Sequence, residues 1–141
     1  MQKTKVLFVC IHNSARSQMA EAFLNHLAGD RFEARSGGIE PGGLNPFAVE
    51  AMKEAGLDIS GNKTKSIPQA FKDHGPFDLV ITVCDETSAE RCPAVPGVSQ
   101  KIHWDFEDPS NVPGGDAEKR RVTRKVRDQI RAKIAEWIKT V

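Results

Sequence analysis

The feature that most constrains the fold of this chain is the alternation of short apolar runs with stretches of helical periodicity. Residues 5–9 (KVLFV) and 77–83 (FDLVITV) are rich in β-branched and apolar residues, which is typical of strands buried on both faces. Weaker strand patterns lie at residues 32–36 and 100–104. The sequence therefore contains four candidate strands.

Three other stretches show the three-to-four-residue apolar period of amphipathic helices. The first runs from Ser17 to a stop at Gly29. The second begins at the capping pair Asn45-Pro46 and stops at Gly56. The third is the tail, whose apolar stripe comprises Val122, Val126, Ile130, Ile134, Trp137, Ile138 and Val141. Strands that alternate with helices predict a three-layer α/β/α fold around a parallel sheet.

Length and composition limit what else the chain can be. Its 141 residues and 15.5 kDa fit a single domain over residues 1–141. A net charge of +1 with 39% hydrophobic residues indicates a globular protein and not a disordered one. No apolar run approaches the roughly 20 residues of a membrane span, and the first apolar stretch is too short for a signal peptide. We expect a monomeric, cytoplasmic protein without a membrane partner.

The tail has an uneven charge. From residue 117 onward it carries nine basic residues against three acidic ones. This excess could indicate nucleic-acid binding. An amphipathic helix also places such residues on its solvated face, and we favour this interpretation. We therefore expect no nucleic-acid partner.

The segment most suited to chemistry is the loop CIHNSARS, residues 10–17, between the first strand and the first helix. Three cysteines in a reducing compartment cannot form a disulfide scaffold, so Cys10 is either an inert core residue or a reactive thiol. The loop amides and the helix dipole can bind a tetrahedral oxyanion, which Arg16 would hold with its planar fork of N–H groups. The same positive field favours a Cys10 thiolate, which would be a nucleophile aimed at the anion. The predicted oxyanion-binding residues are Cys10, Ile11, His12, Asn13, Ser14, Ala15, Arg16 and Ser17.

The C-x5-R-S loop after the first strand resembles that of the low-molecular-weight protein tyrosine phosphatase superfamily. The run CIHNSARSQMAEAFL resembles its arsenate reductase branch. The resemblance implies a four-stranded parallel sheet with helices on both faces and a loop that binds phosphate or arsenate. It also implies a general acid directly before a proline, which matches Asp108. Asp105 and Glu107 are nearby alternatives, and an Asp-Pro pair by itself would indicate only a turn.

Arsenate reduction requires two thiols where phosphate-ester hydrolysis requires one, because only reduction moves electrons. Cys84 ends the third candidate strand, which in a parallel sheet places it at the same edge as Cys10, and Cys92 lies in the following segment. The resemblance implies a relay in which Cys84 attacks Cys10 and Cys92 then attacks Cys84. The alternative is that Cys84 packs in the core and Cys92 has no role. A zinc site is disfavoured because the remaining ligands are absent nearby.

The resemblance also implies a dithiol partner, either thioredoxin or a glutaredoxin-type reductant, and some relatives use mycothiol. The chain has no Tyr, and Ser110 and Asn111 stand where eukaryotic phosphatases place aromatic residues. This favours a small oxyanion as substrate, namely arsenate, with phosphate or sulfate as competitors. The alternatives are a low-molecular-weight tyrosine phosphatase that hydrolyses phosphate monoesters, and a non-catalytic module that binds an oxyanion or nucleic acid.

Asn13, Glu21 and Ser36 match residues that, in some thioredoxin-coupled members of the branch, help to build a potassium site. The Asp that those members add is replaced here by Ser66 in NKTKSIP. The sequence therefore leaves potassium open, and it predicts no other metal site and no cofactor.

Overall fold

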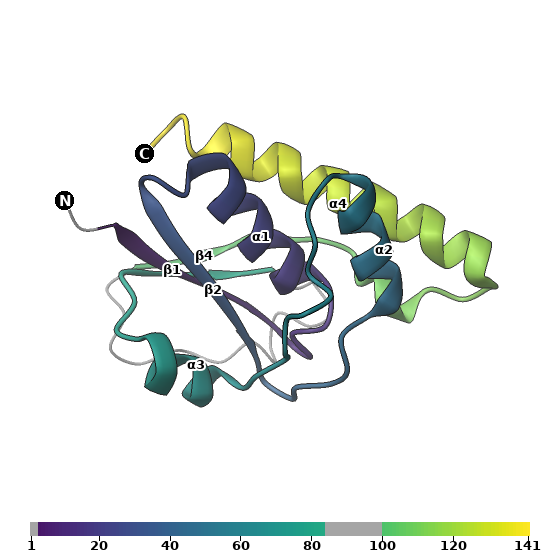
Figure 1. Cartoon of the computed structure of the whole chain (residues 1–141), viewed down its shortest axis with the longest axis horizontal. Helices are drawn as coiled ribbons and strands as arrows, with labels where there is room; N and C mark the ends of the chain where they lie inside the picture. The colour runs from purple at the N-terminus through teal and green to yellow at the C-terminus, as the bar shows by residue number, and fades with distance from the viewer. Residues whose placement is uncertain (1–2, 84–99) are drawn as a thin grey trace.

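The computed structural model describes residues 3–83 and 100–141, and its centre is a four-stranded parallel sheet (Figure 1). The strands lie in the order β2-β1-β3-β4, so β1 is an inner strand. Val6 of β1 pairs with Ala34 of β2 on one side and with Leu79 of β3 on the other. The strands are β1 (Thr4–Cys10), β2 (Phe32–Gly38), β3 (Leu79–Thr82) and β4 (Gln100–His103).

Helices cover both faces of this sheet. Helices α1, α2 and α4 pack together over one face, and α3 covers the other. The expected three-layer α/β/α fold is thus confirmed. The helices are α1 (Arg16–Ala28), α2 (Pro46–Glu54), α3 (Ile67–His74) and α4 (Asp116–Trp137), with a short 3-10 helix η2 (Pro109–Asn111) before α4.

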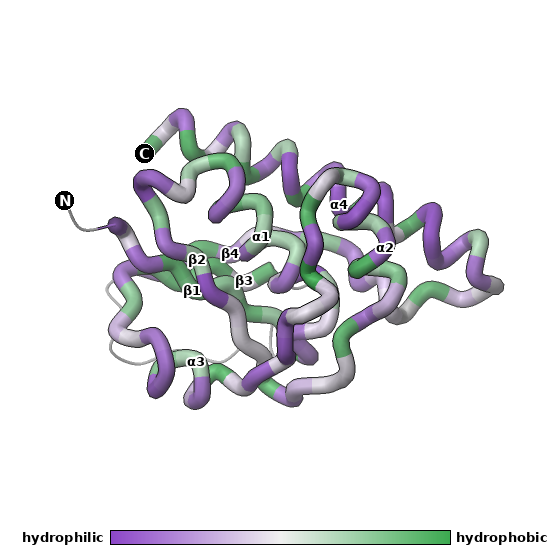
Figure 2. Tube along the Cα trace, viewed as in Figure 1, coloured by the Kyte–Doolittle hydropathy of each residue, from purple (hydrophilic) through white to green (hydrophobic). Residues whose placement is uncertain are grey.

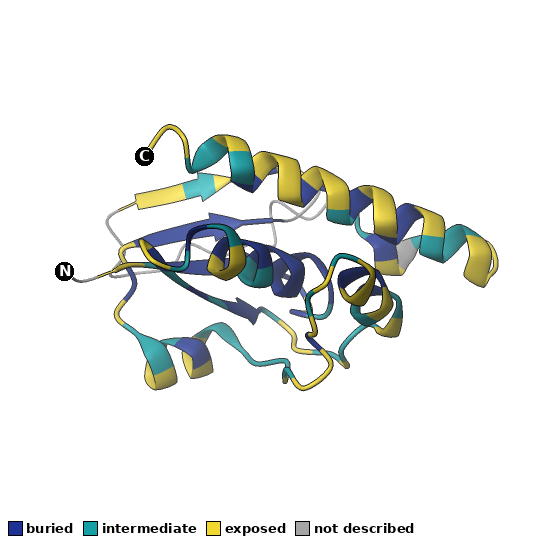
Figure 3. Cartoon of the chain, turned by 45° about the horizontal axis from the view of Figure 1, so that its top comes forward, coloured by how far each residue is buried: buried dark blue, intermediate teal, exposed yellow. Residues whose placement is uncertain are grey.

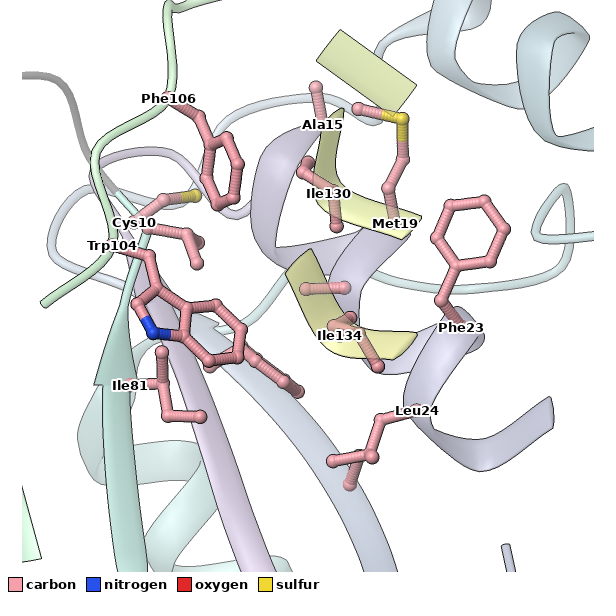
Figure 4. Packing of buried hydrophobic residues seen from close by; sticks show 14 of the residues in the cluster. Cys10, Ala15, Met19, Phe23, Leu24, Ile81, Trp104, Phe106, Ile130 and Ile134 are labelled. Carbon is pink, nitrogen blue, oxygen red and sulfur yellow. The ribbon is translucent and has the colours of Figure 1, made fainter. Parts of the chain in front are cut away.

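The side chains of β1 explain why this strand is a continuous apolar run. Val6, Phe8 and Cys10 belong to the larger core cluster, with residues of α1 and α4. Figure 4 shows Cys10 in this cluster. Leu7 and Val9 point into the smaller cluster beneath α3. All five side chains are buried, so the strand has no solvated face on which polar residues could alternate.

Helix α4 has one buried stripe and a charged outer face (Figures 2 and 3). The buried apolar residues of this stripe are Val122, Val126, Ile130 and Ile134. The prediction that the stripe continues to Val141 is wrong, because the helix ends at Trp137 and Val141 is 57% exposed. On the outer face, Arg120 forms an ion pair with Glu50 of α2 at 3.1 Å. None of the helices in the described ranges is both long enough and apolar enough to cross a lipid bilayer.

Helix α3 was not predicted from the apolar periodicity, since the helix is short and Ala70 is its one buried residue. Its start does carry a local signal, because the Ser66 hydroxyl accepts a hydrogen bond from the Gln69 amide at 3.1 Å. Phe71 of this helix packs edge to face on Phe77, with ring centroids 5.0 Å apart. The helix thereby closes the second face of the sheet.

Candidate active site

The loop of residues 10–17 leads from the end of β1 into the first turn of α1, at the C-terminal edge of the sheet. Cys10 is the last residue of β1 and Arg16 is the first of α1, and both are buried. Ala15 occupies the N-cap position, and no side chain in the described part of the chain caps this helix. The amides of the first turn therefore have no side-chain acceptor, which suits the binding of an anion.

Two donors converge on the sulfur of Cys10. The Asn13 amide donates to Sγ at 3.1 Å, and the Ser17 hydroxyl lies 2.9 Å from Sγ. Asn13 has a positive φ of 54°, a left-handed conformation that Asn tolerates better than most residues, and this turn places its amide next to the sulfur. Both donors stabilise a negative charge on the sulfur.

The Ser17 hydroxyl has a second partner besides the sulfur of Cys10. The Asn13 side-chain amide donates to the Ser17 Oγ at 2.8 Å. Since a hydroxyl has one hydrogen, the Ser17 O–H remains able to donate to the sulfur of Cys10. The three side chains thus form a chain of hydrogen bonds that ends on the sulfur of Cys10.

The carbonyl of the Asn13 side chain anchors the loop to the rest of the molecule. Its Oδ1 accepts from the Gln18 Nε2 and from the Lys65 backbone amide, each at 3.1 Å. Gly38 of β2 passes so close to the loop that a Cβ there would lie 2.8 Å from the Asn13 amide nitrogen. The sequence did not indicate these three supporting residues, because Gln18 looks like an ordinary helix residue and the other two act through the backbone.

Arg16 links the loop to the segment that contains the predicted general acid. Its side chain is 3% exposed, and its Nη1 donates to the Phe106 carbonyl at 3.0 Å. Its Nη2 lies 3.6 Å from Oδ2 of Asp108. These contacts hold the guanidinium in one orientation beside the loop. Other N–H groups of the same planar group can donate to an oxyanion bound by the loop.

Asp108 is the one predicted acid that the structure brings to Arg16. Its other oxygen, Oδ1, accepts from the Ser110 amide at 2.9 Å and starts the 3-10 helix η2. The Asp108 side chain is 23% exposed, so solvent reaches it while Oδ2 faces Arg16. The two alternatives, Asp105 and Glu107, are exposed on the surface.

The remaining loop residues divide between core and surface. Ile11 and Ala15 are buried, and Ser14 is half-buried. His12 is exposed, and its Nδ1 lies 2.8 Å from the Glu40 carbonyl oxygen. Because a carbonyl oxygen can only accept, Nδ1 donates in this contact. His12 therefore lies on the outer side of the loop.

Of the residues that the resemblance linked to a potassium site, the buried Ser36 hydroxyl makes no hydrogen bond within the described ranges, whereas two others are occupied. The Asn13 side-chain oxygen is already taken by two N–H donors, and the Ser66 hydroxyl caps α3. Burial raises the pKa of the Glu21 carboxyl, and the positive charge of the Lys65 ammonium offsets part of this rise. Elsewhere, the described residues include no group of three His, Cys, Asp or Glu side chains that could hold a metal ion.

Cys84 and Cys92, the predicted second and third thiols, lie outside the described residues. Their predicted roles stay predictions. Within the described ranges the structure places Asn13 and Ser17 beside the sulfur of Cys10, and it brings Asp108 to Arg16 at the other end of the same loop.

Comparison with known proteins gives a consistent result. A family model described as low molecular weight phosphotyrosine protein phosphatase matches residues 5–141. The arsenate reductase of Halalkalibacterium halodurans is 43% identical over 140 residues, and that of Bacillus subtilis is 39% identical over 140 residues; each match covers 99% of both chains. The chain therefore belongs to the low-molecular-weight phosphotyrosine protein phosphatase family.

Solved structures place the chain more closely within this family. A structure described as an arsenate reductase in the phosphate binding state aligns with a TM-score of 0.78 and 32% identity over 98% of both chains. A thioredoxin-dependent arsenate reductase of Corynebacterium glutamicum aligns with a TM-score of 0.72 and 31% identity, over 98% of this chain and 61% of that one. Within the family the chain belongs to the branch whose members are named arsenate reductases.

Proposed function

We propose that this protein reduces arsenate to arsenite, with Cys10 as the nucleophile. The observation that carries the proposal is the convergence of two hydrogen-bond donors on a buried cysteine sulfur, in a loop that also contains a buried arginine. The names of the relatives support the choice of arsenate. The solved relative in a phosphate binding state supports a loop that binds a tetrahedral oxyanion.

The first chemical step forms a bond between sulfur and arsenic. The loop amides and Arg16 hold the arsenate oxygens, and the Cys10 thiolate attacks arsenic. Asp108 donates a proton to the departing oxygen, which leaves as water. Arsenic remains As(V) in this adduct, since no electron pair has yet been transferred to it.

The second step reduces arsenic. The Cys84 thiolate attacks the Cys10 sulfur, so that a disulfide forms, the sulfur–arsenic bond breaks, and its electron pair stays on arsenic, which leaves as As(III) arsenite. Cys92 then attacks Cys84, which releases Cys10 as a thiolate. A dithiol protein reduces the Cys84–Cys92 disulfide, and the thioredoxin-dependent relative favours thioredoxin for this part.

The test is steady-state oxidation of NADPH in the presence of thioredoxin and thioredoxin reductase, with and without arsenate. We expect NADPH oxidation to depend on arsenate and to stop in the Cys10→Ser variant. Arsenate-independent oxidation, or none at all, would contradict the thioredoxin-coupled proposal. Repeating the assay with glutaredoxin and glutathione separates a wrong reductant from a wrong reaction.

Hydrolysis of phosphate monoesters is the second candidate function. The tyrosine phosphatase of T. tengcongensis aligns with a TM-score of 0.74 at 26% identity. Hydrolysis would need Cys10, Arg16 and Asp108 but no second thiol, and the contact between Arg16 and Asp108 supports it. Release of nitrophenol from para-nitrophenyl phosphate measures it, and activity of this kind without arsenate-dependent NADPH oxidation would favour the phosphatase.

A further inference from the structure

The side chain of Gln18 is fully buried, and the reaction proposed above does not use it. Gln18 is the third residue of α1, and long side chains on a helix point back toward its N-terminus, which here is the loop of residues 10–17. The Gln18 Nε2 donates to the Asn13 side-chain oxygen at 3.1 Å and to the Lys63 carbonyl at 3.4 Å. The Gln18 Oε1 accepts from the Asn62 side-chain amide at 3.0 Å. Both ends of this buried amide are therefore bonded.

Two main-chain groups determine the orientation of the Gln18 and Asn13 amides. The two ends of a side-chain amide have nearly the same shape, but one end only donates and the other only accepts. The Lys63 carbonyl can only accept, so it selects the NH2 end of Gln18. The Lys65 backbone amide can only donate, so it selects the oxygen of Asn13. Turning either amide over would leave buried polar groups without partners, which is costly.

These orientations produce a row of donors that leads to the sulfur of Cys10. Asn62 donates to Gln18, which donates to Asn13. Asn13 in turn donates to the Ser17 hydroxyl at 2.8 Å, and that hydroxyl lies 2.9 Å from the sulfur. If the Asn13 amide were reversed, its oxygen would take the hydrogen of Ser17 and withhold it from a Cys10 thiolate. Consecutive hydrogen bonds also polarise one another, so each donor in the row strengthens the next.

We propose that Gln18 is a positioning residue for the nucleophile. It holds the Asn13 amide in the orientation that leaves the Ser17 hydrogen to the sulfur. This inference rests on the proposed role of Cys10 as the nucleophile. Gln18 reaches the sulfur only through Asn13 and Ser17, so it acts on the ionisation of the thiol and not on access to it. Asn62 is half-buried at the outer end of the row and should have a weaker effect in the same direction.

The test measures the ionisation of Cys10 without arsenate. Iodoacetamide alkylates the thiolate form, and mass spectrometry of the Cys10 peptide follows the rate at this residue alone as a function of pH. Gln18→Met keeps the approximate length of the side chain and removes its amide. We expect the midpoint of the pH profile to rise by about half a pH unit, which corresponds to roughly threefold slower alkylation below the midpoint. Gln69→Met, the control, removes an exposed amide of α3 that donates to Asp73 and should leave the midpoint unchanged.

The midpoint and the plateau of the profile separate positioning from a loosened loop. The plateau rate at high pH reflects access to the sulfur. A changed plateau with an unchanged midpoint in Gln18→Met would mean that Gln18 only fills space, and it would overturn the proposal. Asn62→Ala tests the same row from its outer end and decides the matter if Gln18→Met does not fold. We expect a smaller rise of the midpoint in this variant, and an unchanged midpoint would contradict the row of donors.

The alkylation assay is independent of the proposed reaction. A raised midpoint in a protein whose NADPH oxidation does not depend on arsenate would support the role of Gln18 and contradict arsenate reduction. Arsenate-dependent oxidation together with an unchanged midpoint would contradict the role of Gln18 and leave arsenate reduction in place.

Discussion

The hydroxyl of Ser17 lies 2.9 Å from the sulfur of Cys10, and because Asn13 donates to the hydroxyl oxygen, the hydroxyl hydrogen is available for a Cys10 thiolate. A hydrogen bond to a charged group contributes about 1.5–3 kcal/mol. The same contact therefore stabilises and positions the sulfur that we propose as the nucleophile.

Ser17→Ala removes this donor. We expect kcat/KM for arsenate to fall roughly tenfold or more, since 1.4 kcal/mol corresponds to a factor of about ten in rate. Ser60→Ala, which removes an exposed hydroxyl bonded to Asp58, is the control. Equal losses in the two variants would mean that the Ser17 hydroxyl has no particular role at the sulfur.

Arg16→Lys keeps the positive charge but loses the planar group that contacts the Phe106 carbonyl and approaches Asp108. We expect kcat to fall by about two orders of magnitude or more, because an ammonium cannot reproduce the fork of donors around the oxyanion. Steady-state kinetics and thermal unfolding should be measured together. A variant that keeps both its folding and its rate would contradict the proposed role of the guanidinium.

Asp108→Asn removes the proton donor of this side chain and keeps its hydrogen-bond acceptor. The Asn oxygen can still accept from the Ser110 amide, so the thermal midpoint should change little. The rate of arsenate reduction should fall about 10²- to 10⁴-fold, as is typical when a general acid is removed. Asp105→Asn and Glu107→Gln are matched controls on exposed neighbours. If either control loses more activity than Asp108→Asn, the acid has been assigned to the wrong residue.

The half-buried Glu21 predicts a pH dependence of stability. Burial raises the pKa of this carboxyl in the folded state above the ordinary value of 4.5. Folding therefore favours the protonated Glu21 carboxyl. Below pH 4.5 the carboxyl does not lower the free energy of unfolding, but it lowers it progressively as the pH rises through the raised pKa. Glu21→Gln should therefore increase the free energy of unfolding at neutral pH, and the gain should shrink toward pH 4.5. Urea unfolding across this pH range tests it, with the exposed Glu136→Gln as control. A gain that is constant with pH would contradict the assignment.

Cys84→Ser and Cys92→Ser should separate reduction from hydrolysis. Each variant should lose multiple-turnover arsenate reduction while keeping slow release of nitrophenol, because hydrolysis requires only Cys10, Arg16 and Asp108. Without Cys92, a Cys10–Cys84 disulfide should accumulate after one turnover, and peptide mapping would detect it. Normal turnover by both variants with thioredoxin would mean that the relay is wrong.

Sequence reasoning found the parts of this site that depend on local spacing. Cys10 and Arg16 could be identified because a strand, a short loop and a helix follow each other directly, and this order alone brings the thiol and the guanidinium to one loop. Asp108 is far away in the chain, so its assignment needed the resemblance to a family.

The supports of the loop could not be found in this way. Gly38 acts through the absence of a side chain, and Lys65 acts through its backbone amide, so neither residue type indicates its role. The short helix α3 could not be predicted from apolar periodicity, because it buries one residue, Ala70, and a single position defines no period. Val141 was misplaced because the apolar pattern continues beyond the point where the helix ends.

The contacts between the loop and residues 63–65 have a consequence for the kinds of change that this protein can tolerate. The Gln18 side chain donates to the Lys63 carbonyl, Asn13 accepts from the Lys65 amide, and the Lys65 carbonyl accepts from Gly38. Each of these contacts uses the main chain, so most substitutions at positions 63–65 leave them intact. A deletion or an insertion of one residue there would shift the amide and both carbonyls together. The loop is thus sensitive to the length of this distant segment and largely indifferent to its composition.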